Sequence, residues 1–311
     1  MAVVAARLWI AFRTFGGARG VGSPVAPPVP YPALMRPPVL TRRRFARTLF
    51  ASAAGMAAGA SAWLGASGSA SAGPPDPEPP ELDGEPSDAS ARPKILLLGD
   101  SMIAGGFGLF LEQGLRDGAG FRVERQGKTS SGLARPDFYD WMERAAAARD
   151  RHRPDAVVCM FGGNDGQGLF MGKKADPAWI RYGEPGWFPE YRRRVAQFAD
   201  IARAEGAALF WIGMPPMGPE KLNERVRAMN VVFRGEMAVR QRAWFVDIWP
   251  LLADEDGAFA THRELEGQRT RVRAHDGVHL NRVGATYLAQ QVIPEIRVRL
   301  DAEPSSVEKR G

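Results

Sequence analysis

The chain has 311 residues, 45% of them hydrophobic, and a formal net charge of +6. The excess of positive charge lies in residues 1–72, which contain eight arginines and no acidic residue, so residues 73–311 carry a formal charge of −2. The main part of the chain therefore lacks the basic character of a nucleic-acid-binding protein. The single cysteine, Cys159, excludes an intramolecular disulfide, and its place in an apolar stretch predicts a buried thiol rather than a reactive one.

The first predicted element is an export signal within residues 1–72. Three consecutive arginines stand in the segment Thr41–Arg47, and a run without charged side chains follows and passes through the small residues Ala70-Ser71-Ala72. This order is typical of a twin-arginine signal with a cleavage site, so we expect the twin-arginine export machinery as a partner and a periplasmic or secreted location. The alternative is an uncleaved membrane anchor. Met35, just before the arginines, is the expected true start.

Behind the signal, composition separates a linker from a folded domain. Residues 73–93 are rich in proline and acidic residues and predict a disordered linker. Residues 94–300 are long enough for one domain with a sizeable core, and residues 301–311 form a polar tail. We expect that this domain does not span a membrane.

Within the domain, short apolar stretches alternate with longer amphipathic ones. The apolar stretches predict five strands, at residues 94–98, 121–124, 155–161, 207–212 and 244–248. The longer segments predict helices at residues 107–116, 136–149, 189–205, 219–240 and 281–300. Pro136 suits the first turn of the second helix, and Gly206 suits the end of the third. This alternation predicts an α/β fold with a parallel sheet between two layers of helices, and a ligand site beyond the carboxyl ends of the strands.

Three residues at the two ends of this domain carry the chemistry of a serine hydrolase. Ser101 follows the first strand at a tight turn, where its hydroxyl can project from the sheet edge. Asp276 stands three residues before His279, so one turn can place the carboxylate beside the imidazole, whose other nitrogen then acts as a base. One alternative is that Ser101 only caps a helix. Another is that Asp276 and His279 bind a metal ion together with His275.

Acyl transfer also needs hydrogen-bond donors for the oxyanion that forms in the transition state. The candidate donors are the backbone N–H groups of Ser101 and Gly132 and the side-chain amide of Asn164. The alternative for Gly162–Asp165 is an ordinary turn. The sequence contains no Gly-x-Ser-x-Gly elbow, Walker A loop or dinucleotide-binding fingerprint, which argues against an α/β-hydrolase and against nucleotide binding.

Four short blocks, in chain order, resemble those of the SGNH/GDSL hydrolases: Gly99-Asp100-Ser101, Ser131-Gly132, Gly163-Asn164-Asp165 and Asp276-x-x-His279. The resemblance covers about residues 94–300, with Met102 where the first block of the family has leucine. In the second block, Gly127 is a rival for the role of Gly132. The resemblance implies a flavodoxin-like three-layer α/β/α fold and serine chemistry without a metal or cofactor.

The resemblance also implies a role for each matching residue. Ser101 is the nucleophile, His279 the general base and Asp276 the partner of that base. Gly132 and Asn164 are the oxyanion donors.

The segment 165–188, directly after the third block, is longer than a simple connection needs and contains five aromatic residues. Because it begins beside Asn164, we expect it to form a wall of the active site. Trp179 and Trp187 are predicted to line that wall and to stack on a sugar-containing substrate. The alternative is a lid that is packed by its own aromatic rings.

Together these features predict an exported serine esterase that removes acyl groups from an envelope or extracellular glycan. The same triad serves an O-acyltransferase in which a sugar hydroxyl replaces water as the acceptor, and the motifs do not separate the two. A non-catalytic glycan-binding module on the same fold is the third alternative.

Overall fold

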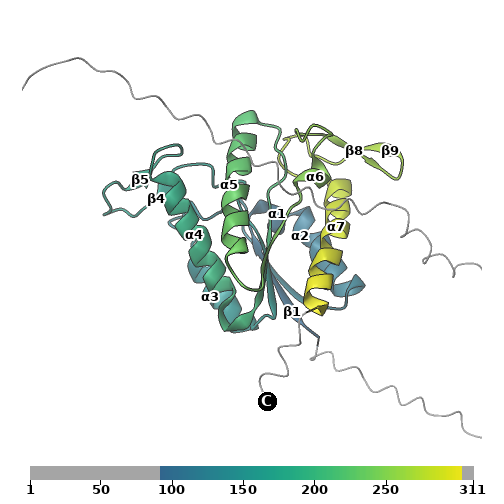
Figure 1. Ribbon diagram of the computed structural model, residues 1–311, viewed down its shortest axis with the longest axis horizontal. Helices are drawn as coiled ribbons and strands as arrows, with labels where there is room; N and C mark the ends of the chain where they lie inside the picture. Colours follow the sequence, from purple (N-terminus) through teal and green to yellow (C-terminus); the bar gives the residue numbers. More distant parts are fainter. Residues whose placement is uncertain (1–91, 303–311) are drawn as a thin grey trace, which may run out of the picture. The chain divides into compact units, whose positions relative to one another are not determined.

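The computed structural model describes residues 92–302 (Figure 1). The predicted export signal, the start at Met35, nearly all of the predicted linker and the tail from residue 303 lie outside the described residues. Within the described part of the chain, no helix is both long and apolar enough to cross a membrane.

A five-stranded parallel sheet forms the centre of the domain, in the order β2-β1-β3-β6-β7. The strands are β1 (Lys94–Gly99), β2 (Arg122–Gly127), β3 (Ala156–Met160), β6 (Ala208–Ile212) and β7 (Ala243–Val246). All residues of β3 and β6 are buried, as expected for strands covered on both faces. The order of the strands changes direction between β1 and β3, and this switch point is where α/β folds open a ligand site.

Helices cover both faces of the sheet (Figure 1). The helices α3, α4 and α5 pack side by side in one layer, and α2 packs against α7 in the other. Their bounds are α1 (Ser101–Ala104), α2 (Gly106–Gln113, continued by a π-turn at Gly114–Gly118), α3 (Trp141–His152), α4 (Trp187–Ala202), α5 (Glu220–Ala238), α6 (Trp249–Leu252) and α7 (Arg282–Asp301). The predicted three-layer α/β/α fold is therefore confirmed.

The largest differences between the predicted and observed helix boundaries are at the start of α3 and the end of α4. The second predicted helix, α3, begins at Trp141 rather than at Pro136, because the Asp140 side chain accepts hydrogen bonds from the N–H groups of Met142 and Glu143 and so caps the helix there. The third, α4, ends at Ala202, and a 3-10 turn over Ala204–Gly206 completes the connection.

Two short hairpins were not predicted. One pairs β4 (Leu169–Phe170) with β5 (Trp179–Ile180), and the other pairs β8 (His262–Leu265) with β9 (Gln268–Arg271). Two-residue strands are too short for a hydrophobic period to reveal them, and β8 and β9 consist mostly of polar residues.

The core between the sheet and the α3–α5 layer is rich in aromatic side chains. Phe161 contacts Trp141 and Phe198 edge to face, and Trp211 stacks on Phe233 at a centroid distance of 4.7 Å. Cys159 lies within β3 and is fully buried, and burial raises the pKa of its thiol well above the ordinary value. The prediction of a buried thiol is confirmed.

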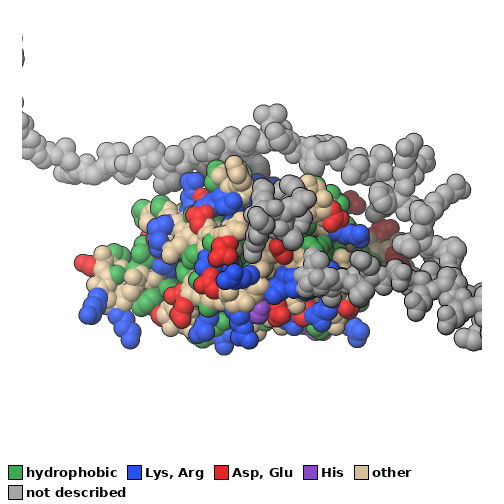
Figure 2. All heavy atoms as spheres, turned by 90° about the horizontal axis from the view of Figure 1, so that it is seen from below, with side chains coloured by type: hydrophobic (Ala, Val, Ile, Leu, Met, Phe, Trp, Pro, Cys, Tyr) green, Lys and Arg blue, Asp and Glu red, His purple; other side chains and the backbone are tan. Residues whose placement is uncertain are grey.

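Charges of both signs are interspersed on the face of the domain drawn in Figure 2. Several of the arginines are ion-paired with acidic residues, as Arg240 is with both Asp200 and Glu236. Much of the arginine content of the described residues therefore serves local pairing rather than a basic binding surface.

Candidate active site

The candidate nucleophile stands where the first strand meets the first helix. Ser101 is the first residue of α1, and the preceding residue, Asp100, is the N-cap, with its Oδ1 accepting a hydrogen bond from Met102 N–H at 2.9 Å. The alternative in which Ser101 only caps the helix is therefore wrong, because Asp100 has that role. Within residues 92–302 the backbone N–H of Ser101 donates no hydrogen bond to another group of the chain. It is free for a ligand, as the first N–H groups of a helix often are.

The candidate acid–base pair lies in the loop before α7, more than 170 residues further along the chain, and reaches the same serine. His279 Nε2 lies 2.9 Å from Ser101 Oγ, and His279 Nδ1 lies 2.6 Å from Asp276 Oδ2. When Nδ1–H donates to the carboxylate, Nε2 has a free lone pair and accepts the serine hydroxyl proton. The structure thus brings Ser101, His279 and Asp276 together in the geometry of a catalytic triad.

Asp276 is held in its charged form. Burial alone would raise the pKa of its carboxyl, but hydrogen bonds from the His279 side chain and from the N–H groups of His279 and Val278 outweigh burial and lower the pKa to about 2. The side chains of Asp276 and His279 are 49% and 42% exposed, so water reaches the base.

A buried arginine, Arg273, holds this loop by hydrogen bonds to the backbone. Arg273 is fully buried, and its guanidinium donates hydrogen bonds to the carbonyl oxygens of Val278 and Pro216 and lies over the Phe259 ring at 5.1 Å. Burial lowers its pKa to about 10, which leaves it charged at neutral pH. Arg273 therefore ties the acid–base loop to the segment after β6.

The second and third blocks meet beside the serine. The Asn164 side-chain amide donates one hydrogen bond, 2.9 Å long, to the Ser131 carbonyl, and its second N–H remains available. A Cβ atom added to Gly132 would lie 2.0 Å from Asp165 Oδ1, so only glycine fits there. The backbone N–H of Gly132 donates to no other group within the described residues. Gly127, the rival of Gly132, lies against α1, where an added Cβ would meet Ala104 N at 2.3 Å.

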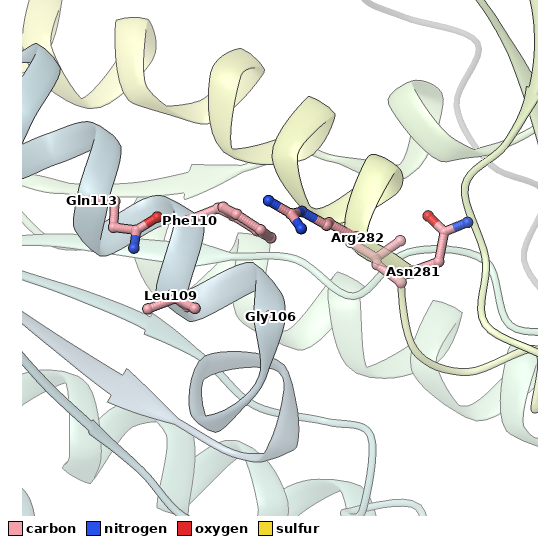
Figure 3. A pocket seen from close by; sticks show the side chains of 7 residues that line it. Gly106, Leu109, Phe110, Gln113, Asn281 and Arg282 are labelled. Atoms are coloured by element: carbon pink, nitrogen blue, oxygen red, sulfur yellow. The ribbon is translucent and has the colours of Figure 1, made fainter.

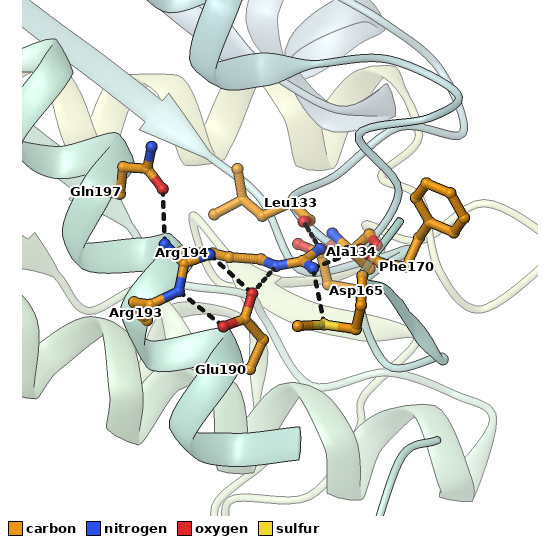
Figure 4. A network of polar contacts seen from close by, with 9 residues as sticks. Leu133, Ala134, Asp165, Phe170, Glu190, Arg193, Arg194 and Gln197 are labelled. Atoms are coloured by element: carbon orange, nitrogen blue, oxygen red, sulfur yellow. Dashed lines mark hydrogen bonds and ion pairs between the residues drawn. The ribbon is translucent and has the colours of Figure 1, made fainter. Parts of the chain in front are cut away.

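A network of buried polar groups fixes the loop that contains Gly132 (Figure 4). Arg194 reaches from α4 and donates hydrogen bonds to the carbonyl oxygens of Leu133, Ala134 and Phe170. Asp165 is fully buried, and its carboxylate accepts hydrogen bonds from Ala134 N–H and from the Tyr191 hydroxyl, each shorter than 3 Å.

Asp100 connects the nucleophile to the third block. Its Oδ2 accepts a hydrogen bond from Gly163 N–H at 3.3 Å, while Oδ1 caps α1. The side chain is fully buried, and this desolvation raises its pKa to about 7, with the nearby Asp165 adding to the effect. Burial likewise raises the pKa of Asp165.

The sequence patterns did not assign a role to these supporting residues. Asp100 and Asp165 lie inside two of the four blocks, so their positions were visible but their functions were not. Arg194 and Arg273 are arginines in arginine-rich surroundings, and only their burial distinguishes them from surface residues. No local pattern could have identified either one.

The prediction that Trp187 lines the substrate site is wrong. Trp187 is 0% exposed, its indole N–H donates a hydrogen bond to the Gln167 carbonyl, and its ring stacks on Tyr191 at 4.8 Å. It begins α4 and packs the segment after the third block against the domain, as the lid alternative proposed. Trp179 is different, because it is 40% exposed and contacts Phe170 and the Arg135 guanidinium.

The metal alternative has no support in the described residues. They contain no group of three or more histidine, cysteine or acidic side chains that could hold a metal ion. His275 Nδ1 lies 3.2 Å from the Arg271 guanidinium. The positive charge of this guanidinium would repel a metal cation bound to the same imidazole.

A family model described as "Protein of unknown function (DUF459)" matches residues 94–295. The chain belongs to this family. DUF459 is SGNH-like, which confirms the resemblance predicted from the four blocks. No curated protein matches the sequence.

Solved structures with a similar chain trace include several hydrolases. A GDSL-like lipase from Bacteroides thetaiotaomicron is 14% identical, and the match covers 65% of this chain and 88% of the lipase at a TM-score of 0.43. A mutant acetyl esterase with an acetate ion is 17% identical over 68% of this chain and 99% of the esterase, with a TM-score of 0.43. A protein named TesA is 20% identical over 66% and 99% of the two chains, also at 0.43.

Proposed function

We propose that this DUF459 protein is a serine esterase that uses Ser101, His279 and Asp276 as its catalytic triad. The observation that carries the proposal is the continuous pair of contacts from Ser101 Oγ to His279 Nε2 and from His279 Nδ1 to Asp276, at 2.9 and 2.6 Å. Two segments that are far apart in the chain, the turn at Ser101 and the loop 276–279, converge to make these contacts at the switch point of a parallel sheet.

In the first half of the reaction, Ser101 Oγ attacks the ester carbonyl carbon while its proton moves to His279 Nε2. Asp276 stabilises the imidazolium that forms and holds the ring in the required tautomer. The tetrahedral intermediate then collapses, the bond to the alcohol oxygen breaks, and His279 returns the proton to the leaving alcohol. In the second half, water attacks the acyl-serine with His279 again as the base, which releases the acid and restores Ser101.

The negatively charged oxygen of the intermediate requires donors that are free before the substrate arrives. The N–H of Ser101, the N–H of Gly132 and the second amide hydrogen of Asn164 meet this condition. Because Arg194 and Asp165 hold the surrounding loop, these donors are positioned in advance, which is the source of electrostatic catalysis.

The test is a comparison of the wild type with Ser101→Ala. The wild type should hydrolyse p-nitrophenyl acetate and bind a fluorophosphonate probe covalently at Ser101. Ser101→Ala should do neither while keeping the circular dichroism spectrum and melting temperature of the wild type. Hydrolysis at the wild-type rate by the folded variant would refute the serine mechanism.

We further propose that the natural substrate is an acylated glycan, with Trp179 providing a stacking surface. Trp179 is exposed in the hairpin that follows Asn164, and the exposed Phe138 ring, with Lys128 at 5.7 Å, lies in the loop after Gly132. Trp179→Ala should raise KM for an acetylated oligosaccharide and leave p-nitrophenyl acetate hydrolysis unchanged. Equal losses on both substrates would exclude this role. Transfer of the acyl group to an added oligosaccharide, instead of hydrolysis, would identify an O-acyltransferase.

We propose export through the twin-arginine route on the basis of the segment Thr41–Arg47. Changing Arg42, Arg43 and Arg44 together to lysine should leave the protein in the cytoplasm with its signal uncleaved. Processing after Ala72 despite this change would instead indicate the general secretory route.

A further inference from the structure

A pocket of about 510 Å³ lies between α2 and the start of α7, and none of the four sequence blocks contributes to it (Figure 3). One wall consists of residues on a single face of α2: Gly106, Leu109, Phe110 and Gln113. The other wall consists of the three residues that directly follow His279, namely Leu280–Arg282.

The pocket adjoins the triad through both of its walls. Helix α2 follows the four-residue helix α1, which begins with Ser101, and Leu280 is bonded directly to His279. The Asn281 side chain accepts a hydrogen bond from Gly284 N–H and donates one to the Arg271 carbonyl, so this wall is firmly placed. Both walls of the pocket are therefore continuous in the chain with segments that contain members of the triad.

The lining combines apolar surface with one cation, Arg282, that forms no ion pair within residues 92–302. Leu109, Phe110 and Leu280 supply the apolar surface. The Arg282 side chain extends from α7 toward Phe110, and its guanidinium lies 5.9 Å from the ring centroid. Among the ion pairs of residues 92–302 none involves Arg282.

Other arginines of the same helix behave differently. Arg297 and Arg299 pair with Asp301 and Glu295 within α7. Arg282 occupies the first position of α7, where the helix dipole disfavours a cation, so helix stability does not account for this residue. Its position is explained if it meets a negative charge that the substrate brings.

We infer that this pocket binds a part of the ester substrate that has an apolar body and an anionic group, with the anion at Arg282. The inference rests on the proposed esterase activity and deepens it, because it names a property of the substrate. A guanidinium binds a carboxylate through two parallel hydrogen bonds, and the Phe110 ring beside it keeps the apolar body from water.

The test compares two esters that differ only in charge, 4-acetoxybenzoate and its methyl ester. The wild type should prefer the charged ester, and Arg282→Gln should lower kcat/KM for it about five-fold, mainly through KM, as expected for a partly exposed ion pair. The methyl ester should be turned over equally by both proteins. Arg282→Lys should restore part of the preference, and Arg297→Gln, near the other end of the same helix, should change the turnover of neither ester.

A binding measurement separates failure of this inference from failure of the esterase proposal. In a Ser101→Ala background, which leaves the ester intact, calorimetric titration with 4-acetoxybenzoate should show binding that Arg282→Gln weakens. The ratio of kcat/KM for the charged ester to kcat/KM for the methyl ester is the quantity to compare. If this ratio is the same for the wild type and Arg282→Gln, the pocket does not bind the anion, and the esterase proposal stands. If no ester is hydrolysed but the binding difference persists, the esterase proposal fails and the pocket remains an anion site. Absence of both effects overturns the inference.

Discussion

Asp100 and Asp276 each lie within three residues of a group proposed to react, yet their surroundings are opposite. Asp100 is fully buried beside Ser101, and desolvation raises its pKa to about 7. Asp276 is half exposed beside His279, and hydrogen bonds lower its pKa to about 2 despite the opposing effect of burial. The contrast shows how one residue type obtains two functions from its surroundings: Asp276 stays ionised beside the proposed base, and Asp100 accepts hydrogen bonds from backbone N–H groups.

The same contrast extends to the two regions that contain these residues. The region of Ser101, Gly132 and Asn164 is held by buried carboxylates that accept backbone N–H groups. The acid–base loop is held by a buried cation, Arg273, that donates to backbone carbonyls. Arg194 donates to backbone carbonyls in the first region as well, so the two regions differ in that only the first also has buried carboxyl groups that accept backbone N–H groups.

Among the variants that keep Ser101, Asp276→Asn should have the largest effect. The amide would donate a hydrogen bond to His279 Nδ1, so the proton would move to Nε2, which then cannot accept the proton of Ser101. We expect kcat to fall by roughly 10⁴ with little change in melting temperature. Steady-state kinetics on p-nitrophenyl acetate would measure this, and a loss below ten-fold would mean that Asp276 is not the partner of the base.

Asn164→Ala should lower kcat by roughly 10²–10³ and change KM little, because an oxyanion donor acts mainly in the transition state. The Asn164 amide also holds the Ser131 carbonyl, so the melting temperature must be recorded beside the kinetics. A change confined to KM would place Asn164 in substrate binding instead.

Arg273→Met tests the support of the acid–base loop. It leaves the carbonyl oxygens of Val278 and Pro216 without donors, which should lower the free energy of unfolding by about 1–3 kcal/mol for each. We also expect kcat to fall while KM stays nearly constant, since the loop would hold His279 less firmly. Arg273→Lys should recover part of kcat, and Arg297→Met, at an exposed arginine of α7, is the matched control. Unchanged kcat in a destabilised Arg273→Met protein would assign Arg273 to folding alone.

Asp100→Asn should have the smallest effect on catalysis and a distinct effect on stability. Because the folded chain raises the pKa of Asp100 from 3.8 to about 7, the contribution of this proton to stability is complete below about pH 4 and is lost as the pH rises through about 7. The unfolding free energy of the wild type minus that of Asp100→Asn should therefore decrease as the pH rises from about 4 to above 7. Urea titrations at pH 4, 5, 6, 7 and 8 would measure it, and a constant difference would contradict the raised pKa.

The sequence by itself determined the layered α/β architecture and the candidate triad. Strands β3 and β6 are buried on both faces and therefore appear as unbroken apolar runs, which locate them without tertiary information. Parallel strands share one carboxyl edge, so Ser101 and Asn164, each shortly after a strand, could be expected to meet there. The three-residue spacing of Asp276 and His279 is also visible in the sequence, and the structure places these side chains in contact.

Only the tertiary structure decided how these residues are held and which neighbours reach the substrate. Arg194 bonds to Leu133 across 61 residues and Arg273 to Pro216 across 57, and contacts between such distant segments leave no periodic pattern in the chain. Trp179 and Trp187 are eight residues apart in one aromatic-rich segment. Trp187 is buried at the start of α4, whereas Trp179 is exposed in the β4–β5 hairpin. Both residues are tryptophans in the same segment, so the local sequence does not distinguish them. Burial separates a core residue from a binding residue, and it is a property of the packed fold.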